Sequence, residues 1–178
     1  MLKRKKAILI RVIIFDIILA MMQPFELSKT EITDKIYLVW NTFISLLTQS
    51  NFKEMDDIQS VALLCFWYDS EVQNGGHLQY FENKGKLFKN RERLLVNSTL
   101  EALNIIGAIE QANILSSASE KYLAQVRKHP QDVNEFCALE LEDEFGEYDR
   151  RYYEYSPDMN SFLEKYLQQH LEAFIKLI

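Results

Sequence analysis

One histidine in the middle of this chain has neighbours that could support general acid–base chemistry. His77 follows the adjacent glycines Gly75 and Gly76, and Glu82 lies a little more than one helical turn beyond it. An imidazole titrates near neutral pH, so it can accept and return a proton when a carboxylate orients it. Asp69 stands on the other side of the glycine pair. This His77/Asp69 corner is the candidate site for an enzyme that acts on a small molecule.

The same residues also suit a purely structural corner, and we favour that interpretation. Aromatic clusters lie on both sides of the glycine pair, and a histidine among aromatic rings is more often a hydrogen-bonded packing residue. Gly75-Gly76 could present amides to an anion, but adjacent glycines more often form a tight turn between helices. Asp69 could receive a basic partner or cap exposed amides. We therefore predict no catalytic residue and no enzymatic activity.

Motifs for metals and nucleotides are missing from the sequence. None of the three histidines follows a glutamate at the spacing of the Glu-x-x-His di-iron motif, and there is no HExxH, GxxxxGK[ST] or GxGxxG. The two cysteines, Cys65 and Cys137, stand among apolar residues and form no CxxC pair. We therefore predict no cofactor, no metal, and two buried free thiols in a reducing compartment.

The elements that must position these residues are helical. Only five glycines and three prolines interrupt 178 residues, and aromatic residues make up 12% of the chain. So few breakers favour long helices, and the aromatic residues supply a large core. We predict an all-α fold, a single compact multi-helix bundle of six to eight helices over residues 26–178. The expected helices span about 28–48, 54–73, 77–83, 90–106, 108–127 and 134–154, and a last one begins after residue 158 and includes Phe174.

Three local signals define expected helix ends. Ser28 and Glu31 have the spacing of a capping box, in which each side chain satisfies a free backbone N–H group. Asn74-Gly75-Gly76 should end the second helix, because glycine readily adopts the left-handed conformation at a C-terminus. Ser156 should cap the last helix, with Pro157 at its first position.

Residues 1–20 differ from the rest of the chain in charge. They carry five bases and one acid, whereas residues 21–178 carry a net charge of −10. Arg11 and Asp16 interrupt the apolar run, so no uncharged stretch is long enough for a membrane-spanning helix. We expect residues 1–25 to be an N-terminal extension, from a mis-assigned start or as a loosely attached helix, with a weak membrane-surface anchor as the alternative. The protein is expected to be cytoplasmic.

Acidic residues concentrate towards the C-terminus. Between Glu135 and Asp158 there are nine acids and only two bases, Arg150 and Arg151. An acidic body repels nucleic acid and attracts basic proteins, so direct binding to DNA or RNA is disfavoured. The plainer interpretation is an ordinary solvated face. The candidate partner-binding residues are Glu140, Glu142, Asp143, Glu144, Glu147 and Asp149.

An apolar stripe should hold this acidic segment to the body. Leu141, Phe145, Tyr148 and Tyr152 recur with helical period, so we expect them to be buried in one continuous helix. The acids between them should then face solvent. Glu140, Glu144 and Glu147 should share one side of that helix, about a turn apart.

The block around the glycine corner resembles a known family. Residues 68–83 resemble the Asn-Gly-Gly…Gln-Tyr-Phe signature of the bacterial DNA-mimic protein family, and residues 102–108 and 141–148 resemble further segments of it. The similarity covers about residues 30–176. The residues taken as the structural signature are Asp69, Asn74, Gly75, Gly76, Gln79, Tyr80 and Phe81.

The resemblance implies an all-α fold and, for the member that names the family, an acidic dimer whose carboxylates imitate DNA phosphates and occupy a transcription factor. We therefore expect a non-enzymatic acidic protein that binds a basic DNA-binding protein, with a homodimer as an open alternative. Bases at residues 84–93 depart from a uniformly phosphate-like exterior. The rival hypotheses are an enzyme at the His77/Asp69 corner and an accessory or immunity-type module that recognises its target by shape.

Overall fold

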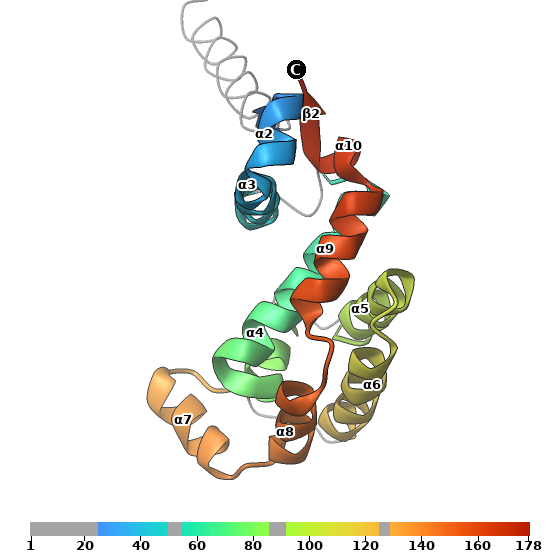
Figure 1. The fold of residues 1–178 in the computed structure, drawn as a ribbon. Helices are drawn as coiled ribbons and strands as arrows, with labels where there is room; N and C mark the ends of the chain where they lie inside the picture. The colour runs from blue at the N-terminus through green and yellow to red at the C-terminus, as the bar shows by residue number, and fades with distance from the viewer. Residues whose placement is uncertain (1–24, 50–54, 86–91, 125–128) are drawn as a thin grey trace, which may run out of the picture. The chain divides into compact units, whose positions relative to one another are not determined.

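The computed structural model describes residues 25–49, 55–85, 92–124 and 129–178 (Figure 1). Its contacts gather in two compact units, which we describe separately: one takes the described parts of Met1–Glu54 together with Leu171–Ile178, and the other takes those of Met55–His170. The predicted N-terminal extension lies outside the described residues except for Phe25, and so does most of the basic patch at 84–93.

The smaller unit combines both ends of the described chain. Strand β1 (Phe25–Leu27) pairs in parallel with β2 (Ile175–Leu177), with Phe25 opposite Ile175. Helices α2 (Lys29–Asp34) and α3 (Ile36–Gln49) follow β1, and the short α10 (Leu171–Phe174) precedes β2. Phe43 of α3 is fully buried and meets the ring of Phe174 edge-on, with ring centroids 4.9 Å apart.

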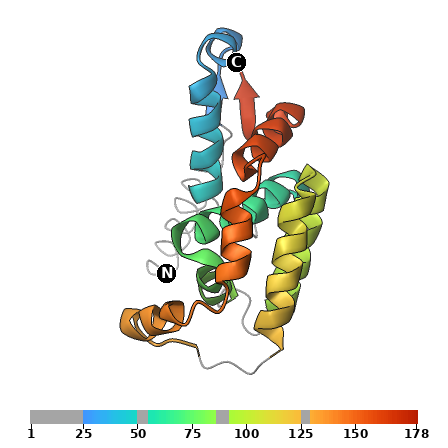
Figure 2. The same cartoon turned by 60° about the horizontal axis from the view of Figure 1, so that its bottom comes forward.

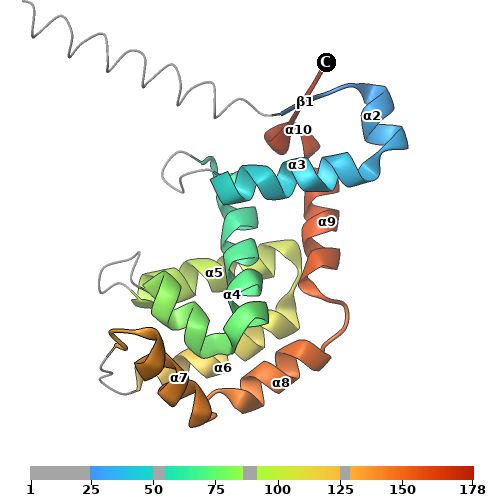
Figure 3. The same ribbon diagram turned by 90° about the vertical axis from the view of Figure 1, so that its left-hand side faces the viewer.

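In its described residues, the larger unit consists of helices and their connections and has no strand. Helix α4 packs against α5, α8 and α9, and α6 packs against α5 and α8 (Figures 2 and 3). Fully buried side chains from four helices, among them Leu63, Leu103, Ile114 and Leu163, form its core. Its helices are α4 (Asp57–Gly85), α5 (Glu92–Ile106), α6 (Ile109–Leu123), α7 (Val133–Leu141), α8 (Gly146–Glu154) and α9 (Met159–Gln169).

The glycine pair divides α4 into two helical segments. Gly75 has φ −169° and ψ 36°, and Gly76 has φ 69° and ψ −174°, so neither is helical. The predicted end of a helix at this point is confirmed, and a second helical segment begins directly at His77; the bend is visible in Figure 3. The predicted break near Gly107 is also confirmed, because this residue has φ 84° at the end of α5.

The predicted all-α class is confirmed. The described residues contain nine helices, and two three-residue strands, which were not expected, accompany them. The capping box of Ser28 and Glu31 is present as predicted. The helix count exceeds six to eight because three expected helices are each divided in two. Lys35 (φ −132°) separates α2 from α3, the turn at Asp143 separates α7 from α8, and His170 (φ −129°) separates α9 from α10. The expected helices 54–73 and 77–83 together form α4.

The prediction of one helix over residues 134–154 was wrong. Asp143 has φ 51°, which no helix interior allows, and the chain turns there between α7 and α8. The turn also removes Leu141 from the predicted buried stripe: Phe145 and Tyr152 are buried, but Leu141 is 87% exposed. A Cβ at Gly146 would overlap the Asp143 carboxylate, so a larger residue there would require that exposed side chain to move.

Two other local predictions need correction. Ser156 does not cap the last helix; Asp158 does, and its side chain accepts from the backbone N–H of Ser161. Helix α9 begins at Met159, so Pro157 belongs to the connection that precedes the helix rather than to its first turn. Cys137, predicted buried, is exposed because it lies on the outer side of α7, whereas Cys65 is buried as predicted.

The two glycines with positive φ offer a matched test of the corner. Gly76→Ala and Gly107→Ala both place a Cβ at a positive φ, which costs roughly 1 kcal/mol or more. The backbone cost is larger at Gly76, because its ψ of −174° lies in a region that essentially only glycine occupies. At Gly107 the new Cβ meets nothing within 4 Å, whereas at Gly76 it lies 2.5 Å from Asp149 Oδ2. We expect G76A to lower the free energy of unfolding in urea by at least about 1 kcal/mol more than G107A, since it also disturbs Asp149. Equal losses would show that the corner is not tightly packed.

Candidate functional site

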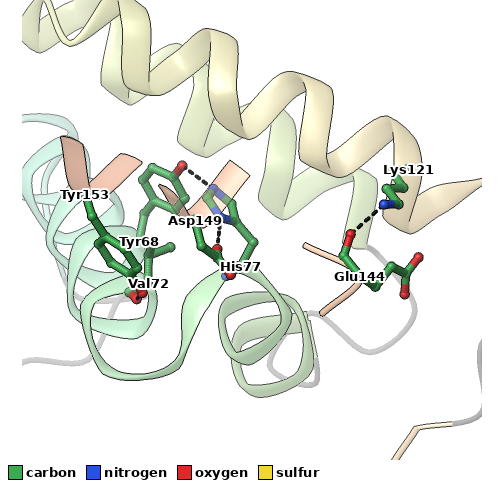
Figure 4. A network of polar contacts seen from close by, with 7 residues as sticks. All are labelled: Tyr68, Val72, His77, Lys121, Glu144, Asp149 and Tyr153. Atoms are coloured by element: carbon green, nitrogen blue, oxygen red, sulfur yellow. Dashed lines mark hydrogen bonds and ion pairs between the residues drawn. The ribbon is translucent and has the colours of Figure 1, made fainter. Parts of the chain in front are cut away.

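The predicted corner is a buried hydrogen-bonded cluster. The side chain of His77 is fully buried, and its Nε2 lies 2.9 Å from the hydroxyl of Tyr68. Its Nδ1 lies 2.5 Å from Oδ1 of Asp149, which also accepts the backbone N–H of His77 at 2.8 Å (Figure 4). One carboxylate of α8 thus holds both the ring and the first free amide of the second segment of α4.

The proton positions in this cluster follow from the two partners of the imidazole, Tyr68 and Asp149. Burial, together with the nearby Tyr80, Asp149 and Asp69, raises the pKa of Tyr68 well above its usual value, so the phenol keeps its proton. The carboxylate of Asp149 can only accept, so Nδ1–H of His77 donates to it, and in the neutral imidazole Nε2 then accepts from the Tyr68 hydroxyl. Every polar atom of the imidazole has a partner in this arrangement.

Two further tyrosines fasten α8 to the first segment of α4. The hydroxyl of Tyr152 donates to Oδ1 of Asp69 at 2.8 Å, and that of Tyr153 donates to the carbonyl of Val72 at 2.6 Å. Burial raises the pKa of Asp69, and the Tyr152 bond partly offsets that rise. Asp69 and His77 therefore bond to different residues, although both bonds hold α8 against α4.

The remaining residues of the expected signature have structural contacts. Asn74 donates to the carbonyl of Ser70 at 2.6 Å, and the amide of Gln79 donates to Glu71 at 3.0 Å. Tyr80 is buried with its hydroxyl 2.9 Å from Thr99, and Phe81 is buried and stacks on Tyr122 at 4.3 Å. Asn74 and Gln79 thus make hydrogen bonds beside the glycine corner, and Tyr80 and Phe81 belong to the core.

This geometry does not support the enzyme hypothesis. The His77 ring is fully buried, and four aromatic rings surround it: those of Tyr68, Phe81, Tyr148 and Tyr152. A substrate cannot reach a nitrogen of this imidazole without displacing part of the core. Among the described residues, no group of three or more histidine, cysteine or acidic side chains is placed to hold a metal ion.

The six predicted partner-binding acids fall into two groups. Glu142, Asp143 and Glu147 are exposed around the α7–α8 turn. Glu140 and Glu144 are half-buried, and the Asp149 side chain is only 19% exposed because it points into the corner. The turn at Asp143 also places Glu140 and Glu147 on different helices, so the expected single acidic side is not formed.

Neighbouring charges modify this acidic group. Partial burial and the negative charges of Asp149 and Asp143 raise the pKa of Glu140. Arg150 approaches Asp143 at 3.5 Å, in an exposed pair that contributes little. Lys121 of α6 donates to the backbone carbonyl of Glu144 (Figure 4), which ties the turn to the body.

A second cluster surrounds the buried carboxylate of Glu82, and the sequence analysis did not predict it. Glu82 was paired in the prediction with His77, but it accepts from the hydroxyl of Tyr122 at 3.0 Å and lies 2.8 Å from Nδ1 of His129. These partners are 40 and 47 residues away along the chain, so only folding brings them together. The contact joins α4, α6 and the residues that precede α7.

A known protein family matches the residues of the larger unit. The family described as DMP19-like protein matches residues 53–170, which is two thirds of the chain. The chain belongs to the DMP19-like family. This is a DNA-mimic family, and its match begins and ends within two residues of the unit Met55–His170. We call residues 55–170 the DMP19-like unit.

The family resemblance in the sequence analysis was wrong in its extent and in its signature motif. It placed the similarity over about residues 30–176 and took Asn-Gly-Gly…Gln-Tyr-Phe as the family signature. The match to the DMP19-like family stops at 53 and 170, so it leaves out α2, α3, α10 and both strands, and it does not identify that block as a signature. The contacts that residues 68–83 make within the DMP19-like unit account for the residue types in this block without a family signature.

Neither the curated proteins nor the solved structures yielded a match to the chain. In the described part of the sequence, no helix has both the length and the apolar character needed to cross a membrane.

The bond between Asp149 and His77 should dominate the stability of the DMP19-like unit. Asp149→Ala removes the acceptor of two N–H groups of His77, one of them fully buried, so we expect a loss of about 2–4 kcal/mol in the free energy of unfolding. Tyr68→Phe removes one bond and should cost about 1 kcal/mol. Glu147→Ala, an exposed change on the same helix, should stay within about 0.5 kcal/mol. Urea denaturation followed by tryptophan fluorescence measures all three, and similar values for D149A and E147A would contradict the assignment.

Glu140 should be destabilising when it is ionised. A raised pKa in the folded state means that folding favours the neutral carboxyl, so stability is lost as the pH rises through that pKa. Glu140→Gln removes this cost, and it should stabilise the protein at pH 7 by less than about 1 kcal/mol, because the half-buried site is partly screened by solvent. The gain should disappear below about pH 4, where the carboxyl of the natural chain is protonated. Thermal unfolding at both pH values tests this, and a gain that persists in acid would refute the electrostatic cause.

Proposed function

We propose that the DMP19-like unit is a non-enzymatic module that occupies the cationic DNA-binding surface of a transcription factor or another basic protein. The observation that supports this most directly is a run of 21 residues, 129–149, which holds eight acids and neither lysine nor arginine. The run contains α7, the turn at Asp143 and the start of α8. Family membership supplies the DNA-mimic context.

The overall charge favours such a partner. Residues 55–170 carry 20 acids and 11 bases, so their net charge is −9. A field of this sign attracts a basic protein and repels nucleic acid. Several acids are unavailable, however, because they hold the fold: Asp149 bonds His77, Asp69 bonds Tyr152, and Glu82 bonds Tyr122.

The contact residues are therefore fewer than the six predicted from sequence. Glu142, Asp143 and Glu147 remain exposed, and Asp132 and Glu135 at the start of α7 are exposed as well. The rigid attachment of α8 through Asp149, Tyr152 and Tyr153 holds the α7–α8 turn in place. Charges presented on a fixed framework bind with less loss of conformational freedom than charges on a mobile tail.

Binding of this kind should depend strongly on salt. Exposed charges interact over a Debye length of about 8 Å at physiological ionic strength, and added salt shortens that range. A module that recognises its partner by shape alone would be nearly insensitive to salt. That behaviour would favour the accessory or immunity-type alternative.

The test is displacement of proteins from DNA. DNA-binding proteins of the source organism are loaded on double-stranded DNA beads, and the full chain is added at increasing concentration. The natural chain should release a specific protein, and Glu142→Gln with Glu147→Gln should raise the concentration for half release about five- to tenfold, because each exposed charge contact contributes up to about 1 kcal/mol. The matched control is Glu101→Gln with Glu120→Gln, which removes two exposed charges from α5 and α6.

The outcomes separate the hypotheses. If the control variant is impaired in release as strongly as the test variant, the effect is one of general charge and involves no defined surface. No release of any protein by the natural chain would refute DNA mimicry. Release that is equally strong at low and high salt would leave recognition by shape.

A further inference from the structure

Helix α7 places three apolar side chains on its outer face. Val133 is 74% exposed and Leu141 is 87% exposed, and Cys137 between them is exposed too. These three residues stand at i, i+4 and i+8, so they form one stripe along the helix. Phe136, Leu139 and Glu140 are only half-buried, and they lie on the side of the helix that faces the body. No residue of α7 is buried.

This arrangement is unusual for a short helix that packs on a folded unit. Most such helices place their apolar stripe against the core, because burial of that stripe provides most of their stability. In α7 the stripe of Val133, Cys137 and Leu141 lies outside, while the helix stands at the edge of the unit (Figures 1 and 2). Contiguous exposed apolar surface with a polar rim marks an interaction site.

We propose that this stripe, Val133–Cys137–Leu141, docks an amphipathic basic helix of the partner protein, whose apolar side chains lie on the stripe and whose lysines and arginines meet the acids beside it. The inference deepens the proposed function and rests on it, because it takes the partner to be a basic DNA-binding protein. It adds that charge alone does not make the contact.

Charge complementarity selects this occupant. The stripe is bordered by exposed acids, Asp132 and Glu135 near its start and Glu142 at its end, and residues 129–149 provide no base to balance them. A second copy of the chain on the same stripe would place acids against acids, which costs free energy in a symmetric contact. An anionic membrane surface would be repelled for the same reason.

The surface beside the stripe has room for a side chain of the partner. A hollow of about 310 Å³ lies between α4 and the first half of α7, and it is bordered by Gln79, Asn83, Val133 and Phe136. It adjoins the start of the stripe through Val133. A large side chain that entered it would be anchored at one end of the docked helix.

The two parts of this surface should act on different steps of binding. Exposed acids accelerate association over a distance and lose that effect in salt, whereas a buried apolar contact mainly slows dissociation. Binding should therefore weaken with salt but retain a component that salt does not remove. A contact made only by carboxylates would lose nearly all of its affinity.

The probe is an 18-residue peptide of leucine and lysine whose leucines repeat with helical period, compared with a scrambled peptide of identical composition. The full chain should bind the amphipathic peptide at least about tenfold more tightly than the scrambled one, because only the former presents a continuous apolar face. Val133→Gln with Leu141→Gln should reduce that affinity at least about fivefold at both 0.15 M and 0.5 M salt. Fluorescence anisotropy measures the dissociation constants.

A matched control removes two exposed apolar residues elsewhere. Ile105 and Ile109 are 61% and 52% exposed near the junction of α5 and α6, and Ile105→Gln with Ile109→Gln should leave peptide binding unchanged. Urea denaturation of both double variants confirms that they fold. Equal binding of the two peptides, or an equal effect of the two double variants, would overturn the proposal.

Three other results would also overturn it. Loss of a dimer in V133Q/L141Q, seen by sedimentation, would make the stripe a self-association surface. Tighter peptide binding after K3Q/R4Q/K5Q/K6Q would make the chain's own basic N-terminal residues the occupant. Preferred binding of the natural chain to anionic vesicles over the peptide would make it a membrane-contact face.

The failure of this inference and that of the proposed function give different results. If the natural chain and V133Q/L141Q release proteins from the DNA beads equally well, the docking proposal fails while DNA mimicry stands. If the stripe is required for peptide binding but the natural chain releases nothing from DNA, DNA mimicry fails and the partner is a basic protein of another kind.

Discussion

The DMP19-like unit depends on one carboxylate that reaches from α8 to the bend of α4. Asp149 accepts the backbone N–H and the ring N–H of His77, directly after the two non-helical glycines. A helix start has free N–H groups, and a buried one needs an acceptor. Because this acceptor comes from a residue 72 positions away, the bend and the position of α8 stabilise each other in the folded protein.

Hydrogen bonds in the interior decide which acids are available for binding. Asp149, Asp69 and Glu82 are partly or fully buried and bonded, so they stabilise the fold, while Glu142 and Glu147 stay exposed. An acidic protein must keep like charges apart, and Glu140 shows the cost where they approach, since burial and two neighbouring carboxylates raise its pKa. The unit thus combines an acidic exterior segment with a packed interior that is aromatic around His77.

Helices α7 and α8 differ in how they are attached to the rest of the DMP19-like unit. Helix α8 is bonded to α4 through three side chains and buries Tyr152. Helix α7 buries none of its residues and exposes an apolar stripe among acids. A surface that joins apolar contact with charge can discriminate between partners better than charge alone, because the wrong partner leaves apolar surface uncovered or charges unpaired.

Sequence by itself determined the features that depend on nearby residues: the all-α class, the capping box at Ser28, the bend at Gly75-Gly76 and the break at Gly107. These follow from local conformational preference and helical period, which neighbours along the chain express. Tertiary structure decided the rest. It turned the chain at Asp143, exposed Leu141 and Cys137, and drew Asp149 inward to His77. In the sequence, Asp149 stands among other acids and is therefore predicted to face solvent. In the folded protein, the distant amide of His77 needs an acceptor, and Asp149 turns inward to provide it.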